Sequence, residues 1–97
     1  MSISVHVRSS EHNDISSYGD NRDEIPQIRD AAADGTLLRC ISKHSDTMFN
    51  GKQIMLLIDE IDRFPRSSSD FDQPLGMLRA AAQSALDANG YLWFSGD

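Results

Sequence analysis

The sequence predicts a single α+β domain over residues 1–97, with two layers in which three helices pack on one face of a small sheet of about three strands. Three observations favour this class: an amphipathic segment at 50–64, a segment rich in alanine and leucine at 73–88, and short runs of strand-forming residues near both ends. The expected order is therefore strand, helix, strand, helix, helix, strand.

Residues 50–64 carry the clearest helical pattern. Asn50 can cap the first turn, Gln53 can complete a capping box, and Pro65 disfavours helical geometry at the residue before it. Asn50-Gly51 is also a hairpin signal, but the acidic residues at 59–62 are poor strand formers, so the helix is favoured. The apolar positions form one stripe at helical spacing: Ile54, Leu57, Ile58, Ile61 and Phe64.

The amino-terminal part begins with a strand. Residues 3–7 alternate between apolar and polar side chains, which is typical of a strand with one face on a core and the other in water. Residues 9–21 are polar, so we expect a long loop there, with Ile15 and Tyr18 as its anchors.

A short helix is expected next, from Asp23 or Glu24 to Gly35. Residues 36–42, TLLRCIS, have two faces that are not cleanly divided, which favours an interior strand, and residues 43–49 are predicted to be a connection. If the helix crosses between adjacent strands, the first two strands are parallel.

The segment at 73–88 predicts the third helix. Asp72 is expected to cap it, Phe71 to act as a hydrophobic staple, and Gly90 to end it. Its apolar face consists of small and large aliphatic residues: Leu75, Leu78, Ala82, Ala85 and Leu86.

Composition limits the classes of partner. The net charge is −6 and the pI is near 4.8, so the chain repels nucleic acid and anionic membranes, and neither is expected as a partner. The sequence has no apolar run that could span a membrane and no secretory signal, and its one cysteine fits a reducing compartment, so we expect a cytoplasmic protein.

No motif predicts an enzyme, a cofactor or a metal site. IMLLIDEID resembles the second nucleotide-site motif of AAA+ ATPases, but the phosphate loop that must accompany it is absent, so nucleotide hydrolysis is rejected. Cys40 and His44 are four residues apart and form the only enzyme hypothesis that we retain, as a nucleophile and its base. This spacing matches no recurring metal motif.

Two exposed apolar features predict contact surfaces. Leu56 lies on the charged side of the helix at 50–64. In the last strand, residues 91–94, Tyr91 and Trp93 point away from their neighbours and are expected on the solvent face of the sheet, where aromatic residues often anchor partners.

A resemblance narrows the kind of partner. The LLIDEI helix, the alanine- and leucine-rich helix and the ending YLWFSGD resemble small acidic bacterial proteins of uncharacterised families, some of which accompany toxins as immunity proteins. The resemblance implies a domain that blocks a basic toxin without turnover. The residues that it implies as contacts are acids and aromatic anchors: Asp59, Asp62, Asp70, Asp72, Tyr91 and Trp93. The alternative is a structural or regulatory homodimer joined through the solvent face of the sheet.

Overall fold

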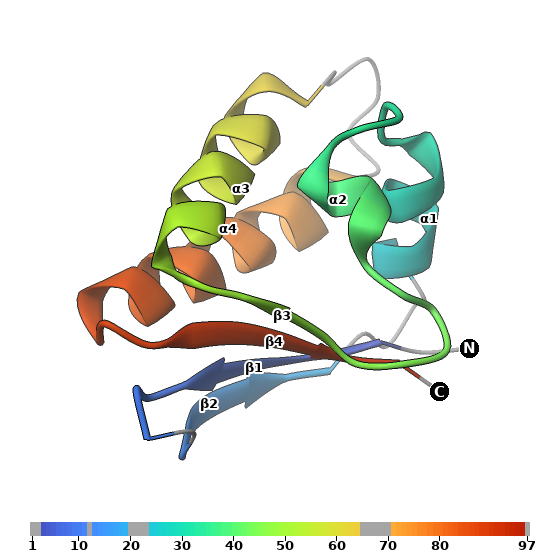
Figure 1. The fold of residues 1–97 in the computed structure, drawn as a ribbon. Coiled ribbons are helices and arrows are strands. Elements are labelled where there is room, and N and C mark those ends of the chain that lie inside the picture. The colour runs from blue at the N-terminus through green and yellow to red at the C-terminus, as the bar shows by residue number, and fades with distance from the viewer. Residues whose placement is uncertain (1–2, 12, 20–23, 65–70, 97) are drawn as a thin grey trace.

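The computed structural model describes residues 3–11, 13–19, 24–64 and 71–96, which form an α+β fold with a four-stranded antiparallel sheet and four helices. The helices lie on one side of the sheet, and in the described part of the chain no helix covers the other side (Figure 1). The elements are β1 (Ser4–Arg8), β2 (Asp14–Tyr18), α1 (Glu24–Ala31), α2 (Leu37–Cys40), β3 (Thr47–Phe49), α3 (Gly51–Arg63), α4 (Asp72–Asp87) and β4 (Tyr91–Ser95).

The sheet has the strand order β2-β1-β4-β3, so its central pair joins the first and last of the described strands. In this pair Val5 lies opposite Phe94 and His6 lies opposite Trp93. The alternation predicted for both strands is confirmed, since inward residues such as Val5 and Leu92 are fully buried and their neighbours are partly exposed. The face with His6 and Trp93 therefore points away from the helices.

The helix predicted at 50–64 is confirmed as α3, and the hairpin alternative is wrong. Its start is fixed by a capping box, in which the side chain of Asn50 accepts from the Gln53 N–H and the side chain of Gln53 accepts from the Asn50 N–H. Ile54, Leu57 and Ile61 are fully buried against the sheet and α4. Each such side chain stabilises the fold by about 1.5–3 kcal/mol relative to an exposed one.

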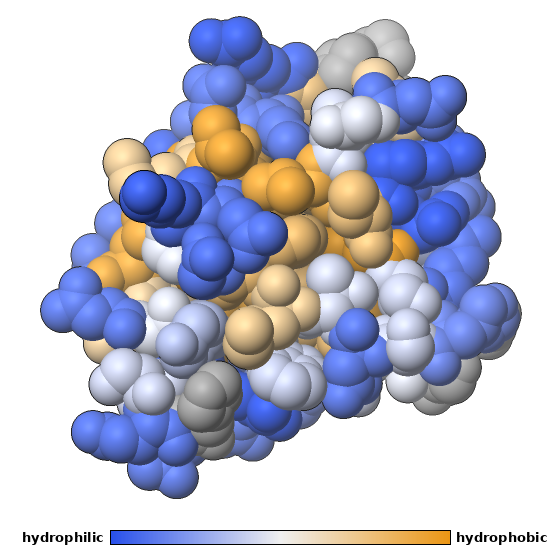
Figure 2. All heavy atoms as spheres, viewed as in Figure 1, coloured by the Kyte–Doolittle hydropathy of each residue, from blue (hydrophilic) through white to orange (hydrophobic). Residues whose placement is uncertain are grey.

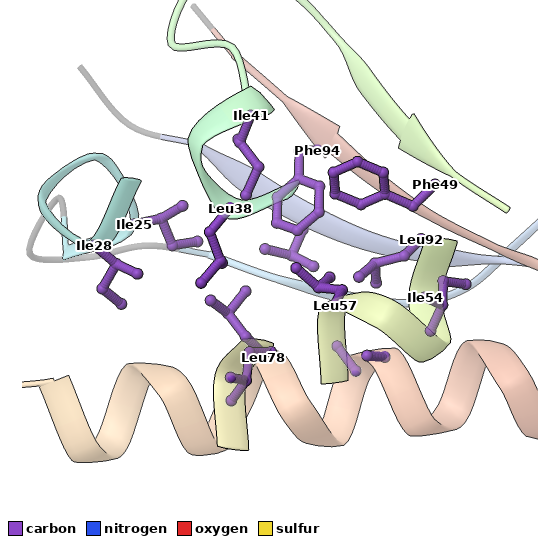
Figure 3. Packing of buried hydrophobic residues seen from close by; sticks show 14 of the residues in the cluster. Ile25, Ile28, Leu38, Ile41, Phe49, Ile54, Leu57, Leu78, Leu92 and Phe94 are labelled. Carbon is purple, nitrogen blue, oxygen red and sulfur yellow. The ribbon is translucent and has the colours of Figure 1, made fainter. Parts of the chain in front are cut away.

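The core lies between the sheet and the helices (Figure 3). Phe49 from β3 and Phe94 from β4 meet edge to face, with their ring centroids 5.7 Å apart. α4 contributes Leu75, Leu78 and three alanines, and the small alanines allow this helix to approach β1 closely.

Two predictions about the ends of α4 need correction. Asp72 is the first helical residue and not the cap; the cap position is Phe71, which makes no capping hydrogen bond through its side chain and packs edge to face on Phe64. At the other end Asn89 adopts the left-handed conformation (φ 52°) that we expected of Gly90. Gly90 is needed for another reason, because a Cβ there would lie 1.9 Å from the Arg8 carbonyl oxygen.

The loop predicted at 9–21 is partly wrong, because residues 14–18 form the edge strand β2. This strand pairs with β1 and has an irregularity where Arg8 faces Asp14. Its residues are mostly polar, so they show no alternation of apolar and polar side chains that would predict a strand. Of the two expected anchors, Tyr18 packs against the core, whereas Ile15 is 54% exposed.

The strand predicted at 36–42 is wrong. Its residues form the short helix α2, and the strand of this region is β3, which lies inside the segment predicted as a connection. The expected parallel pair is therefore absent from the described strands, which are all antiparallel. α1 is confirmed but ends at Ala31, while Gly35 takes a positive φ (85°) in the turn before α2.

Candidate functional site

Two solvent-facing surfaces contain four of the seven predicted contact residues, and they lie on different layers of the fold. We call the first the α3 surface; its residues are Lys52, Met55, Leu56, Asp59 and Arg63. We call the second the open face; it is the helix-free side of the sheet, and its residues are His6, Arg8, Ser17, Met48, Tyr91 and Trp93.

The α3 surface exposes two large apolar side chains. Met55 is 63% exposed and Leu56 is 59% exposed, because helical periodicity turns both away from the buried stripe of α3. Figure 2 shows apolar residues gathered on the side of the molecule where α3 and α2 pack together. Exposed apolar side chains that cluster in this way mark interaction surfaces more often than single ones do.

A pocket of about 360 Å³ opens at the carboxyl-terminal half of the α3 surface. Its apolar lining comes from the end of α1, from α2 and from the end of α3, and its polar lining is mostly from α3. The lining residues are Ala31, Ala32, Ala33, Thr36, Leu38, Asp59, Glu60, Arg63 and Phe64. Asp59 and Arg63 therefore belong both to the α3 surface and to the pocket.

Glu60 is the residue of this site that the sequence did not reveal. Its two carboxylate oxygens accept hydrogen bonds from the backbone N–H groups of Leu37 (2.9 Å) and Leu38 (3.1 Å) at the start of α2. The Thr36 side chain accepts from the Arg39 N–H at the same helix start. Glu60 therefore connects α2 to α3, and the acidic character of 59–62 was the only signal for it in the sequence.

The predicted acids of α3 both have partners within the chain. Asp59 lies 3.3 Å from Arg63 one turn later, and both side chains are more than half exposed. Asp62 binds Arg79 of α4 at 2.8 Å, and this hydrogen bond raises the pKa of Arg79. Only the first pair is on the α3 surface next to the pocket.

Of the other two predicted acids, only Asp72 is among the described residues, and it does not belong to this surface. Asp72 is exposed in the first turn of α4, and Asp70 lies outside the described residues. The structure therefore places Leu56 and Asp59 together, and it separates both from Tyr91 and Trp93 on the sheet.

Trp93 lies at the centre of the open face. Across the sheet its neighbours are His6 on β1 and Met48 on β3, which is 41% exposed. The Arg8 guanidinium lies 4.2 Å from the centroid of the Trp93 ring and also binds Asp14 at 2.7 Å. The open face thus carries an aromatic centre with a cation and an anion beside it.

Most of the described lysine and arginine side chains are paired with acids of the same chain. Six of the seven lysine and arginine side chains that the structure describes have a carboxylate within 4.0 Å. These pairs are Arg8–Asp14, Arg29–Asp30, Arg39–Asp34, Lys43–Asp30, Arg63–Asp59 and Arg79–Asp62. With a net charge of −6, the field outside the molecule is therefore set by surplus acids.

Comparison with known proteins gives no match. The sequence fits no family model, and neither curated proteins nor solved structures show significant similarity to it. Its resemblance to immunity proteins therefore stays an expectation from the sequence.

The residues of the enzyme hypothesis are both on the surface. Cys40 is exposed at the end of α2, and the exposed His44 donates its backbone N–H to Ser42 Oγ at 3.2 Å. Among the described residues no group of three or more His, Cys, Asp or Glu side chains is placed to hold a metal ion. Every helix in the described ranges is too short or too polar to cross a membrane.

Proposed function

We propose that the chain is a non-enzymatic protein-binding domain that contacts a basic protein through its α3 surface, in the manner of an immunity protein that blocks a toxin. The observation that supports this proposal most is the exposure of Met55 and Leu56 next to a mostly apolar pocket whose lining includes Asp59 and Glu60. Apolar side chains that anchor a contact, with charged groups around them, are the usual composition of a protein interface.

The charge of the chain favours a basic partner. The net charge of −6 attracts a basic protein to the chain as a whole, and in the adjoining pocket two acids, Asp59 and Glu60, outnumber one cation, Arg63. This complementarity accelerates association at low ionic strength and excludes acidic competitors. Binding should therefore weaken as salt concentration rises.

The test combines discovery of a partner with two matched variants. Proteins that copurify with the chain, and the product of any adjacent gene, are purified and titrated against it by calorimetry. Leu56→Asp is expected to weaken binding at least about tenfold, because hot-spot truncations cost about 2 kcal/mol or more. Trp93→Ser, on the open face, is the control and is expected to leave the affinity unchanged.

Two results would contradict the proposal. One is that none of the purified candidate proteins binds the chain in the titration. The other is a partner whose affinity is lowered by Trp93→Ser and not by Leu56→Asp. If the partner is a toxin, its activity must fall on addition of the chain and return with Leu56→Asp.

A second candidate function is a homodimer joined through the open face. The observation that favours it is the balance of charge on the open face, where Arg8 and Asp14 lie side by side although the chain is acidic. Two copies related by a twofold axis can therefore place Arg8 of one copy against Asp14 of the other. Light scattering separates the candidates, because a dimer that Trp93→Ser converts to a monomer supports this function, whereas a wild-type monomer contradicts it.

A further inference from the structure

The pocket at the end of the α3 surface is hollow because one of its walls consists of alanines. Ala31, Ala32 and Ala33 line it from the end of α1 and the turn that follows, and Phe64 lines it from the end of α3. A methyl group reaches only a short way from the backbone, so this wall leaves space that a larger side chain would fill. The resulting volume of about 360 Å³ falls within the range of about 300–1,000 Å³ typical of ligand pockets.

The walls of the pocket are held in place without a ligand. Glu60 connects α3 to α2 through two hydrogen bonds to backbone N–H groups, and Leu38 of α2, which lines the pocket, is almost fully buried in the core. Arg29 of α1 donates to the Ile41 carbonyl oxygen just after α2 at 2.6 Å, which holds the alanine wall to the same unit. A site whose walls are already ordered loses little conformational freedom on binding.

The charges in the lining determine which charged group an apolar ligand of this pocket can carry. Its lining includes two carboxylates, Asp59 and Glu60, and one cation, Arg63. The Arg63 side chain is 80% exposed, and an exposed i,i+4 pair such as Arg63–Asp59 contributes only about 0.3–0.5 kcal/mol. An incoming cation can therefore replace Arg63 at Asp59 at little cost. An incoming anion could pair only with Arg63, and it would be repelled by the two carboxylates of the lining.

The geometry points to a binding site for an alkyl chain that ends in a cation, which in a protein partner is the side chain of a lysine or an arginine. Its methylene groups contact the alanine wall, Leu38 and Phe64, and its charged end reaches Asp59 at the rim. Lysine and arginine side chains bury their stems on apolar surfaces while the charged head stays near water or an anion. This inference rests on the proposed function, since it names the group that a basic partner inserts beside Leu56.

Small probes test the site without a partner. Pentylammonium, 1-pentanol and pentanoate have similar chains and differ in charge, and each is titrated into the ¹⁵N-labelled chain while amide shifts are followed by NMR. We expect pentylammonium to shift the amides of Ala32, Leu38 and Phe64 saturably, about three- to fivefold more tightly than 1-pentanol. Pentanoate is expected to bind most weakly, and ammonium chloride, which has no alkyl chain, to cause no saturable shift.

Four surface variants assign the effect to the pocket. Asp59→Asn is expected to reduce the affinity for pentylammonium to that for 1-pentanol. Arg63→Ala is expected to increase the affinity for pentylammonium, because it removes a competing cation. Asp87→Asn is the matched control: this exposed acid of α4 does not line the pocket, so the affinity should not change. Ala33→Leu, which fills the space, is expected to abolish binding of all three probes.

The inference is overturned if the three probes bind equally, if none of them shifts the amides of the lining, or if Asp59→Asn has no effect. Its failure is distinct from failure of the proposed function. A partner that depends on Leu56 while the probes do not bind would refute the pocket alone. Selective binding of pentylammonium with no protein partner would support the pocket and refute the function.

Discussion

Leu56 and Leu57 are adjacent and chemically identical, yet one is 59% exposed and the other fully buried. The step of about 100° between consecutive helical residues separates them, since α3 presents only one face to the core. The same step places a potential anchor of the α3 surface beside a core residue of the fold.

Truncating each leucine separates the two roles. Leu57→Ala is expected to lower the free energy of unfolding by about 2–5 kcal/mol, because it leaves a cavity in the buried cluster between the sheet and the helices. Leu56→Ala is the control and is expected to change it by less than about 0.5 kcal/mol. Urea denaturation measures both, and similar losses in the two variants would contradict this account of α3.

Two glycines, Gly90 and Gly76, are expected to respond in opposite ways to replacement by alanine. Gly90→Ala places a Cβ within 1.9 Å of the Arg8 carbonyl oxygen, so we expect a loss of about 1–3 kcal/mol or more as β1 and β4 shift apart. Gly76→Ala lies on the exposed side of α4 with no atom within 4 Å of the new Cβ, so a gain of about 0.5–1 kcal/mol is expected. Thermal unfolding measures both signs, and stabilisation by Gly90→Ala would show that the close approach is absent.

At the scale of elements, α2 depends on a residue that is distant in sequence. A helix of four residues has no intrinsic stability, and its first N–H groups need acceptors. Thr36 supplies one acceptor locally, whereas Glu60 supplies two from α3.

Removal of the Glu60 carboxylate should loosen α2. In Glu60→Ala we expect the amides of Leu37 and Leu38 to exchange with solvent about tenfold faster or more, since a charge-assisted hydrogen bond contributes about 1.5–3 kcal/mol. Asp59→Ala, the neighbouring acid that does not bind α2, is the control. Hydrogen exchange followed by NMR gives both rates, and unchanged protection in Glu60→Ala would mean that Thr36 alone holds the helix.

The difference between local and distant contacts explains which elements could be predicted from the sequence. The signals of α3, its stripe and its capping box, lie within the helix itself, and so do those of β1 and β4. α2 was missed because Glu60 overrides the local preference of residues 36–42, and β2 because its polar residues pair with β1 at the edge of the sheet. In the site, periodicity could place Leu56 and Asp59, but the pocket needs the alanines of α1 and the turn after it to meet α3.

Charge acts at the scale of the whole molecule. Asp30 at the end of α1 lies 2.7 Å from the ammonium of Lys43 and 2.9 Å from the guanidinium of Arg29, so it connects α1 to the segment after α2. The hydrogen bond from Lys43 is the main cause of the lowered pKa of Asp30, with a smaller contribution from Arg29, and desolvation opposes both.

This shift predicts a dependence of stability on pH. Because the pKa of Asp30 is lower in the folded chain, its ion pairs stabilise the fold at neutral pH, and this stabilisation is lost as the pH falls below the ordinary aspartate pKa and through the lowered one. Lys43→Met is expected to raise the pKa of Asp30 towards the ordinary value, measured by carboxyl ¹³C NMR. Lys52→Met, on α3, is the control that should leave it unchanged.

The pairing of β1 with β4 also determines when the sheet can be completed during synthesis. β1 leaves the ribosome before the other described elements and β4 leaves it after them, so a nascent chain that has reached Asp87 holds β1 without its β4 partner. The buried face of α4 then lacks the part of the sheet that β4 supplies. A chain arrested at this point is expected to be cut rapidly by protease, and addition of the residues of β4 should confer resistance in a single step.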